Sequence, residues 1–294
     1  MDTEITSVGV IGLGIMGGAF ARHFVEAGLR TLGYDPLESP LHAFAAAGGH
    51  ACESARAVAA EADLLITSLP DAAALDDVLR GIISAQRPGL IVVETSTLSL
   101  PEKEVGRARL ADSGIAMLDA PISGTGPQAQ AKDIIIFASG DQADFDQARG
   151  VLAHLTHSIR YVGAFGAGTK LKLIANLLVA VHIMAAAEAL VLGEKAGFDA
   201  TELVDLLVHS AATSRMLEVR GPSMAAGAYM TPMMKADVFQ KDLKLIAEFA
   251  SASGAPVPVF GVSAAHFLEL SARGMGGYDT AAVIAILRQK AASL

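Results

Sequence analysis

Apolar and polar positions alternate along the first half of the chain in a pattern of strand followed by helix. Stretches with helical spacing, such as Ile15–Ala27 ending before Gly28, separate short apolar runs. The runs that we expect to be strands are Val8–Ile11, Thr31–Tyr34, Leu64–Ser68, Ile91–Glu94, Ala116–Asp119 and Ile134–Ser139. Because strand–helix–strand units form right-handed crossovers, this pattern predicts an α/β domain with a parallel, doubly wound sheet.

The pattern changes at a glycine-rich segment, residues 163–168. From Thr169 onward the chain shows long apolar helical periods and no further strand signal. We therefore expect two domains, an α/β domain over residues 1–165 and an all-helical domain over residues 166–294. A length of 294 residues agrees with this division at roughly 150 residues per domain.

Three glycines stand where the first apolar run gives way to the first helical pattern. Gly12 can turn the chain out of the strand, Gly14 lets the backbone approach a pyrophosphate, and Gly17 permits close helix–strand packing. The helix that follows offers free N–H groups and a partial positive charge to a diphosphate. We expect Leu13, Ile15 and Met16, which lie between the glycines, to line the same ligand. The alternative is a glycine-rich turn in an unrelated α/β unit.

Asp35 closes the second apolar run, where a carboxylate can accept hydrogen bonds from the hydroxyls of an adenosine ribose. The same carboxylate would repel the 2′-phosphate of NADP. No arginine follows in Asp35-Pro36-Leu37 that could pair with that phosphate. The sequence thus favours NAD over NADP as cofactor.

Composition and charge narrow the class of protein. Hydrophobic residues make up 52% of the chain and charged residues 18%, which predicts a large core. A net charge of −9 argues against a nucleic-acid partner, because phosphate contacts need clustered lysine and arginine. Cys52 is the single cysteine, so no disulfide within the chain is expected. The N-terminus has no signal-peptide pattern, and we expect a cytoplasmic protein.

The apolar segment Leu173–Gly193 has nearly the length of a membrane span. Asn176, His182 and Glu188 interrupt it, so we expect a core or interface helix and no membrane, with Glu188 as a buried structural acid. The mean hydropathy of +0.45 and this alanine-rich helix also favour a homodimer or homotetramer.

Lys172 is the candidate for proton transfer. It lies at the start of this apolar helical segment, and burial disfavours the charged ammonium, so the amine could exchange a proton near neutral pH. Asn176 follows four residues later and shares its helical face, whereas Lys170 points elsewhere. The alternative is that Lys172 extends its amine into solvent at a helix end.

Four segments of the chain, in this order, carry a family resemblance. They are the glycine fingerprint, the stretch Asp119–Gly124, the run containing Gly166, Gly168, Lys172 and Asn176, and the stretch Phe239–Leu243. Together they resemble the β-hydroxyacid dehydrogenase family, which includes 3-hydroxyisobutyrate, tartronate semialdehyde, glyoxylate and threonate oxidoreductases. The resemblance spans nearly the whole chain. It implies an α/β N-terminal Rossmann-type dinucleotide-binding domain followed by an all-α C-terminal domain, as in 6-phosphogluconate dehydrogenases.

The resemblance also implies an activity. Lys172 would be the general acid/base in hydride transfer between NAD and a small β-hydroxy acid or its semialdehyde. Ser123 and Gly124 would hold the substrate carboxylate, with Thr125 beside them, and Asn176 would bind the substrate. Taken alone, Ser123 and Gly124 could equally be a simple turn.

The resemblance places further residues at the cofactor. Leu69, Pro70, Thr97 and Lys241 would line it, and Asp242 would support the active-site helices. Taken alone, Pro70 could merely end a strand, and Lys241 and Asp242 could form a solvated pair of little energetic weight.

The chain departs from the family pattern after Gly124. Thr125, Gln128 and Lys132 stand where relatives usually carry glycine, so the substrate loop is expected to have a different shape. Val179 stands seven residues after Lys172, where 6-phosphogluconate dehydrogenases place a glutamate, which disfavours decarboxylation of a sugar phosphate. The scattered histidines lack the spacing of metal ligands, so no metal site is expected.

Two rival interpretations remain. Imine reductases share the fingerprint and the helical domain but usually lack the lysine and tend to prefer NADP. A non-enzymatic nucleotide-binding module is the second. Lys172 and Asp35 argue against an imine reductase, and the presence of Lys172 argues against a non-enzymatic module.

Overall fold

The computed structural model describes residues 5–293, and the chain divides into two compact units, Met1–Lys172 and Leu173–Leu294. The boundary falls inside one long helix, α8 (Ala167–Lys195). Each unit has its own hydrophobic core.

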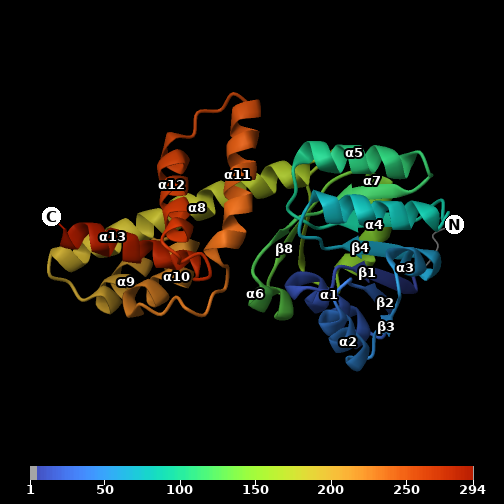
Figure 1. The fold of residues 1–294 in the computed structure, drawn as a ribbon, viewed down its shortest axis with the longest axis horizontal. Coiled ribbons are helices and arrows are strands. Elements are labelled where there is room, and N and C mark those ends of the chain that lie inside the picture. The colour runs from blue at the N-terminus through green and yellow to red at the C-terminus, as the bar shows by residue number, and fades with distance from the viewer. Residues whose placement is uncertain (1–4, 294) are drawn as a thin grey trace. The chain divides into compact units, whose positions relative to one another are not determined.

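The first unit is built on a six-stranded, wholly parallel sheet (Figure 1). Its strands are β1 (Ser7–Ile11), β2 (Arg30–Tyr34), β3 (His50–Ala51), β4 (Leu64–Thr67), β5 (Ile91–Glu94) and β6 (Ala116–Asp119). They lie in the order β3-β2-β1-β4-β5-β6, the doubly wound arrangement of dinucleotide-binding domains. The predicted fold class is confirmed.

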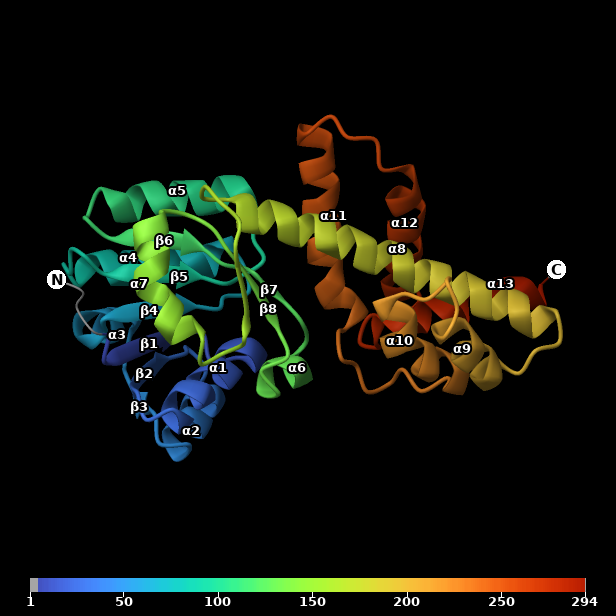
Figure 2. The same cartoon turned by 180° about the vertical axis from the view of Figure 1, so that it is seen from behind.

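Apolar side chains cover both faces of this sheet. Along β1 and β4, Val8, Val10, Leu64 and Ile66 belong to one core cluster, whereas Leu65 belongs to the other. This alternation buries both faces, as parallel sheets require. The helices that flank the sheet are α1 (Ile15–Glu26), α2 (Glu38–Ala46), α3 (Ala55–Glu61), α4 (Ala72–Ser84), α5 (Leu100–Ala111) and α7 (Gln142–Leu152). Figure 2 shows α7 on the face opposite α4 and α5.

A second, three-stranded sheet corrects one expectation. The expected strand at residues 134–139 exists as β8 (Ile135–Ala138), but it does not join the main sheet. It pairs antiparallel with β7 (Ile122–Ser123) and parallel with β9 (Ser158–Tyr161). The short helix α6 (Gly126–Gln130) connects β7 to β8. Strands β3 and β7 have two residues each, too few for periodicity to reveal, and β9 is only half-buried.

The secondary-structure elements of the second unit are all helices in its described residues, as predicted, with one isolated β-bridge between Lys235 and Asp279. Its elements after α8 are α9 (Ala200–Val208), α10 (Arg215–Ala226), α11 (Ala236–Ala252), α12 (Pro258–Ala272), a 3₁₀ turn (Thr280–Ala282) and α13 (Val283–Ala292). Phe239 and Phe267 pack edge to face between α11 and α12, at 5.4 Å between ring centroids.

Helix α8 is long and apolar enough to cross a membrane by length and composition, although a core helix passes the same test. In this structure 39% of its most apolar window is buried. Ile174, Leu178 and Leu192 are exposed on it. Glu188 is also exposed, so the expectation of a buried acid there is wrong.

Candidate active site

The glycine loop has the sterics that a dinucleotide fingerprint demands. Gly12 adopts φ +89°, and a Cβ there would lie 2.2 Å from the carbonyl oxygen of Ser68. A Cβ on Gly17 would lie 1.8 Å from the carbonyl oxygen of Gly12. No side chain fits at either position, so both glycines are needed to bring α1 against β1 and β4.

Gly14 provides the open side of the same loop. A Cβ at Gly14 would meet nothing within 4 Å, and Ile15, the first residue of α1, is 76% exposed. The N-terminus of α1 has no side-chain cap and no acidic residue in its first turn. Its N–H groups therefore face space that a diphosphate fits by charge and by hydrogen bonding. Leu13 is buried, and Met16 packs on the core beneath the loop.

A hollow of about 210 Å³ adjoins this loop. Its wall combines the loop with side chains of α1, α2 and α6, including Leu13, Gly14, Ile15, Arg22, Phe44 and Gln130. Arg22 is exposed at its edge and adds a positive charge within a chain that is acidic overall.

Asp35 is fixed against the glycine loop. Its Oδ2 accepts a hydrogen bond from the backbone N–H of Leu13 at 2.8 Å, and its Oδ1 accepts one from Leu37 at 2.9 Å. The side chain is buried, at 9% exposure. Each carboxylate oxygen can accept a further hydrogen bond. The position thus suits the ribose hydroxyls that an adenosine would present at the end of β2.

Two loops follow the carboxyl ends of β4 and β5 and are tied together. The N–H of Leu69 donates to Oγ of Ser96 at 2.7 Å, and the N–H of Ser96 donates to Oε1 of Glu94 at 2.7 Å. Pro70 is exposed and Thr97 is half-buried beside this link. The structure therefore brings the predicted cofactor residues Leu69, Pro70 and Thr97 to one edge of the sheet, where ligands of such sheets bind.

The segment expected to bind the substrate carboxylate starts as a strand. Ser123 pairs with Ile135, and Gly124 follows with φ +147°, where a Cβ would lie 2.6 Å from Cγ2 of Ile134. The N–H and hydroxyl of Thr125 both donate to Oε1 of Gln128 at 3.0 Å. Thr125 and Gln128 thus hold each other in a capping box at the start of α6.

Lys172 and Asn176 lie one turn apart on α8. Lys172 is 8% exposed, in contrast to Lys170, which is exposed. Asn176 is buried, and its Nδ2 donates to Oδ2 of Asp242 on α11 at 2.8 Å. That bond gives Asp242 a means of orienting the amide, while Lys241 beside it is half-buried.

A cluster of buried charges near the loops after β4 and β5 was missed from the sequence. It is made of Glu94, Lys103 and Asp119, each with 0% exposure. The sequence did carry a signal for this cluster. Glu94 and Asp119 each end an apolar run that predicts a buried strand, and an acidic residue is almost never fully buried unless it is paired.

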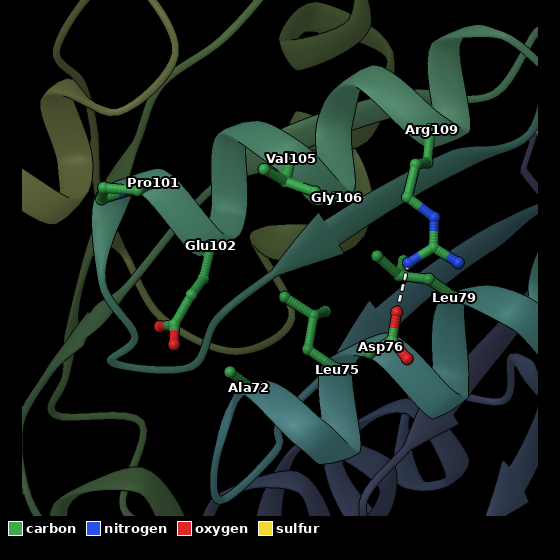
Figure 3. A pocket seen from close by; sticks show the side chains of 9 residues that line it. All are labelled: Ala72, Leu75, Asp76, Leu79, Pro101, Glu102, Val105, Gly106 and Arg109. Atoms are coloured by element: carbon green, nitrogen blue, oxygen red, sulfur yellow. Dashed lines mark hydrogen bonds and ion pairs between the residues drawn. The ribbon is translucent and has the colours of Figure 1, made fainter.

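A separate groove of about 280 Å³ lies between α4 and α5 (Figure 3). It is mainly apolar, with the ion pair of Asp76 and Arg109 at one end and Glu102 at the other. None of the predicted site residues lines it, and its Glu102 already caps α5 through Ser99. Within residues 5–293 no group of three or more histidine, cysteine or acidic side chains is arranged to hold a metal ion.

Comparison with known proteins agrees with this geometry. Residues 7–163 match the model for the NAD-binding domain of 6-phosphogluconate dehydrogenase, and residues 166–287 match the NAD-binding model of NADP-dependent 3-hydroxyisobutyrate dehydrogenase. An L-threonate dehydrogenase of Cupriavidus necator is 37% identical over 95% of both chains. The chain belongs to the β-hydroxyacid dehydrogenase family.

Solved structures of this family superpose over almost the whole chain. A 3-hydroxyisobutyrate dehydrogenase from Salmonella typhimurium is 35% identical, with a TM-score of 0.86 over 95% of this chain and 99% of its own. The Mycobacterium tuberculosis 3-hydroxyisobutyrate dehydrogenase, crystallised with L-serine, is 30% identical, with a TM-score of 0.89 over 97% and 99%. As a member of this family, the chain is an oxidoreductase. Both family models that it matches describe domains that bind a nicotinamide dinucleotide.

Proposed function

We propose that this protein transfers a hydride between NAD and a small hydroxy acid or its semialdehyde, with Lys172 as general acid/base. The observation that carries the proposal is the burial of Lys172, at 8% exposure, on the helix that follows a complete dinucleotide-binding unit. Relatives named for L-threonate and for 3-hydroxyisobutyrate support a hydroxy acid as substrate.

Different residues would bind the diphosphate, the ribose and the substrate. The first turn of α1 and the open side of Gly14 would hold the diphosphate, and Asp35 would hold the ribose. Ser123 and the backbone at Gly124 would hold the substrate carboxylate, with Thr125 beside them. Asn176, oriented by Asp242, would contact the substrate hydroxyls.

Proton transfer belongs to Lys172. When bound, NAD supplies the acceptor for the hydride that leaves the carbinol carbon. The neutral amine of Lys172 takes the hydroxyl proton as the carbonyl forms, and in reduction the ammonium returns it to the same oxygen. Proton and hydride leave adjacent atoms, so the chain's own task is to align the hydroxyl with the amine.

The cofactor preference follows from Asp35. Its buried carboxylate would repel a 2′-phosphate, and no arginine lies in the turn after β2. NAD is therefore the proposed cofactor over NADP. Leu69, Pro70, Thr97 and Lys241 would line it.

The proposal includes a cytoplasmic homodimer or homotetramer. Exposed apolar side chains on α8 and α12, among them Leu192, Val259 and Val262, support association with a second copy. A small-molecule substrate is the proposed ligand, and the net charge of −9 gives no support to a nucleic-acid partner.

The decisive experiment assays a panel of hydroxy acids (3-hydroxyisobutyrate, glycerate, threonate and tartrate) for NADH formation by wild-type protein, Lys172→Ala and Lys170→Ala. Loss of the acid/base should lower kcat of Lys172→Ala by roughly 10²–10⁴ while NADH binding is retained. Lys170→Ala removes an exposed lysine from the same helix and should keep wild-type turnover. Wild-type kcat in Lys172→Ala would overturn the assignment.

A further inference from the structure

The first unit buries three charged side chains in one cluster that the proposed mechanism does not use. Glu94 ends β5, Asp119 ends β6, and Lys103 projects from α5; all three have 0% exposure. The Lys103 Nζ lies 2.8 Å from Oδ1 of Asp119 and 3.9 Å from Oε1 of Glu94. Buried charges are unfavourable unless paired, so one ammonium here serves two carboxylates.

Asp119 also holds the beginning of helix α8. Its Oδ2 accepts from the N–H of Thr169 at 2.8 Å, and its Oδ1 accepts from the hydroxyl of Thr169 at 2.7 Å. The hydroxyl of Ser139 donates to Oδ2 of Asp119 at 3.1 Å and accepts from the N–H of Gly168 at 3.0 Å. Side chains from the sheets therefore satisfy the N–H groups that a helix start leaves free.

The start of α8 is pressed against the backbone of the sheets. A Cβ on Gly168 would lie 2.2 Å from the carbonyl oxygen of Phe137 and 3.0 Å from that of Asp119. Thr169, in contact with Asp119, precedes Lys172 by three residues, so the two side chains are neighbours on one helical face. Lys172 therefore lies within one helical turn of the residue that Asp119 holds.

Glu94 connects the same cluster to the loop at Leu69, which is predicted to bind the cofactor. The hydroxyl of Thr67 donates to Oε2 of Glu94, whose Oε1 accepts from the N–H of Ser96. Ser96 in turn accepts from the N–H of Leu69. One chain of buried polar contacts therefore runs from the loop at Leu69 to the first turn of α8.

We propose that Asp119, charge-balanced by Lys103, is a positioning residue that aims Lys172 through Thr169. The inference rests on the proposed role of Lys172 and extends it. The same set of polar contacts connects the helix that carries Lys172 with the loop at Leu69. The Lys172 amine keeps its orientation because the hydroxyl of Thr169 is fixed to Oδ1 of Asp119.

Thr169→Val tests this directly. Valine keeps the shape and the backbone N–H bond of residue 169 but removes the hydroxyl bond to Asp119, whereas Thr169→Ser restores that bond. We expect kcat of Thr169→Val to fall roughly tenfold, with KM and the Kd for NADH within about twofold of wild type, because misplacement by a fraction of an ångström affects the chemical step. Thr169→Ser should recover most of the turnover.

A purely structural role predicts a different pattern. Thr169→Val would then unfold at a lower temperature but turn over like wild type when assayed well below that temperature, and this result would overturn the inference. Ser139→Ala, which releases Gly168 and one contact of Asp119, gives the same test by a second route if Thr169→Val yields no folded protein.

The double variant separates this inference from the proposed function. If Thr169 acts through Lys172, adding Thr169→Val to Lys172→Ala should produce no further loss of kcat. A further tenfold loss in that background would overturn the positioning role. Wild-type turnover of Lys172→Ala itself would refute the proposed function, whereas an inactive Lys172→Ala beside a fully active Thr169→Val would refute only the present inference.

Discussion

Lys103 and Asp119 form an ion pair of 2.8 Å in which neither side chain is exposed. Removing the ammonium leaves Asp119 and Glu94 as uncompensated buried charges, so Lys103→Met should destabilise the protein by about 3–5 kcal/mol. Urea unfolding of the two proteins measures the difference. Lys244→Met removes an exposed lysine paired to Glu248 and should leave stability unchanged. Equal stability of Lys103→Met and wild type would contradict the burial of this pair.

The glycine loop gives a matched pair of alanine variants. Gly14→Ala fills only open space, so the melting temperature should not change, but the Kd for NADH should rise roughly tenfold, or about 1.4 kcal/mol. Gly17→Ala forces a Cβ against the carbonyl oxygen of Gly12 and should destabilise the fold by about 1–3 kcal/mol. Thermal unfolding and NADH fluorescence titration give both readouts. Unchanged NADH affinity in Gly14→Ala would place the diphosphate elsewhere.

Asp35 is predicted to select NAD. Asp35→Asn keeps the size of the side chain and removes its charge, so the ratio of kcat/KM with NAD to that with NADP should fall about tenfold, the equivalent of about 1.4 kcal/mol. Glu38→Gln removes an exposed carboxylate three residues later and is the control. The assignment fails if both variants shift the ratio equally, or if neither does.

Asp63 makes stability depend on pH at the start of β1. Its Oδ2 accepts from the N–H of Thr6 at 3.1 Å, and from the N–H and hydroxyl of Ser7 at 2.9 and 2.8 Å. Burial raises the pKa of Asp63, but these hydrogen bonds outweigh it and lower the pKa overall. A carboxyl with a lowered pKa stabilises the fold above its unfolded pKa of about 3.9, and that contribution is lost as pH falls through the folded value.

Asp63→Ala should therefore be less stable than wild type by about 1.5–3 kcal/mol at neutral pH. The difference in stability between the two proteins should shrink as the pH falls through the lowered pKa of Asp63, because the wild-type carboxyl is then protonated as well. Urea unfolding across this pH range measures both quantities. A difference that persists undiminished in acid would assign the effect to packing.

The proposed assembly can be tested on α8. Leu192 is 72% exposed, and Leu192→Lys should reduce the mass measured by light scattering from dimer or tetramer toward monomer. Val105→Lys changes a side chain of 59% exposure in the groove between α4 and α5 and should leave the mass unchanged. A monomeric wild-type protein at micromolar concentration would contradict the proposal.

The parts that the sequence predicted are those with local causes. The turn at Gly12, the close approach at Gly17 and the strand end at Asp35 each depend on a few neighbouring residues. The chain after Thr169 forms helices because its apolar residues recur with the helical period over many turns. The structure confirms the predicted fold class and places Asp35 against the glycine loop, where it accepts a hydrogen bond from the N–H of Leu13.

The parts that were missed depend on distant partners. Lys103 gives no sequence signal of burial, because its partner Asp119 lies on β6, 16 residues further along the chain. The second sheet was misassigned because β7 is two residues long and shows no alternation. In each case the decisive information is a tertiary contact, which spacing along the chain does not contain.

The antiparallel register of Ser123 with Ile135 has one last consequence. In a strand, a shift of one residue turns a side chain to the opposite face, and this pairing prevents such a shift. Residues 125–133 lie between the two paired strands, so a change of composition or length there would leave the pairing of Ser123 with Ile135 in place. The segment between them could thus be redesigned for acids of other shapes without moving Ser123, the proposed ligand of the substrate carboxylate.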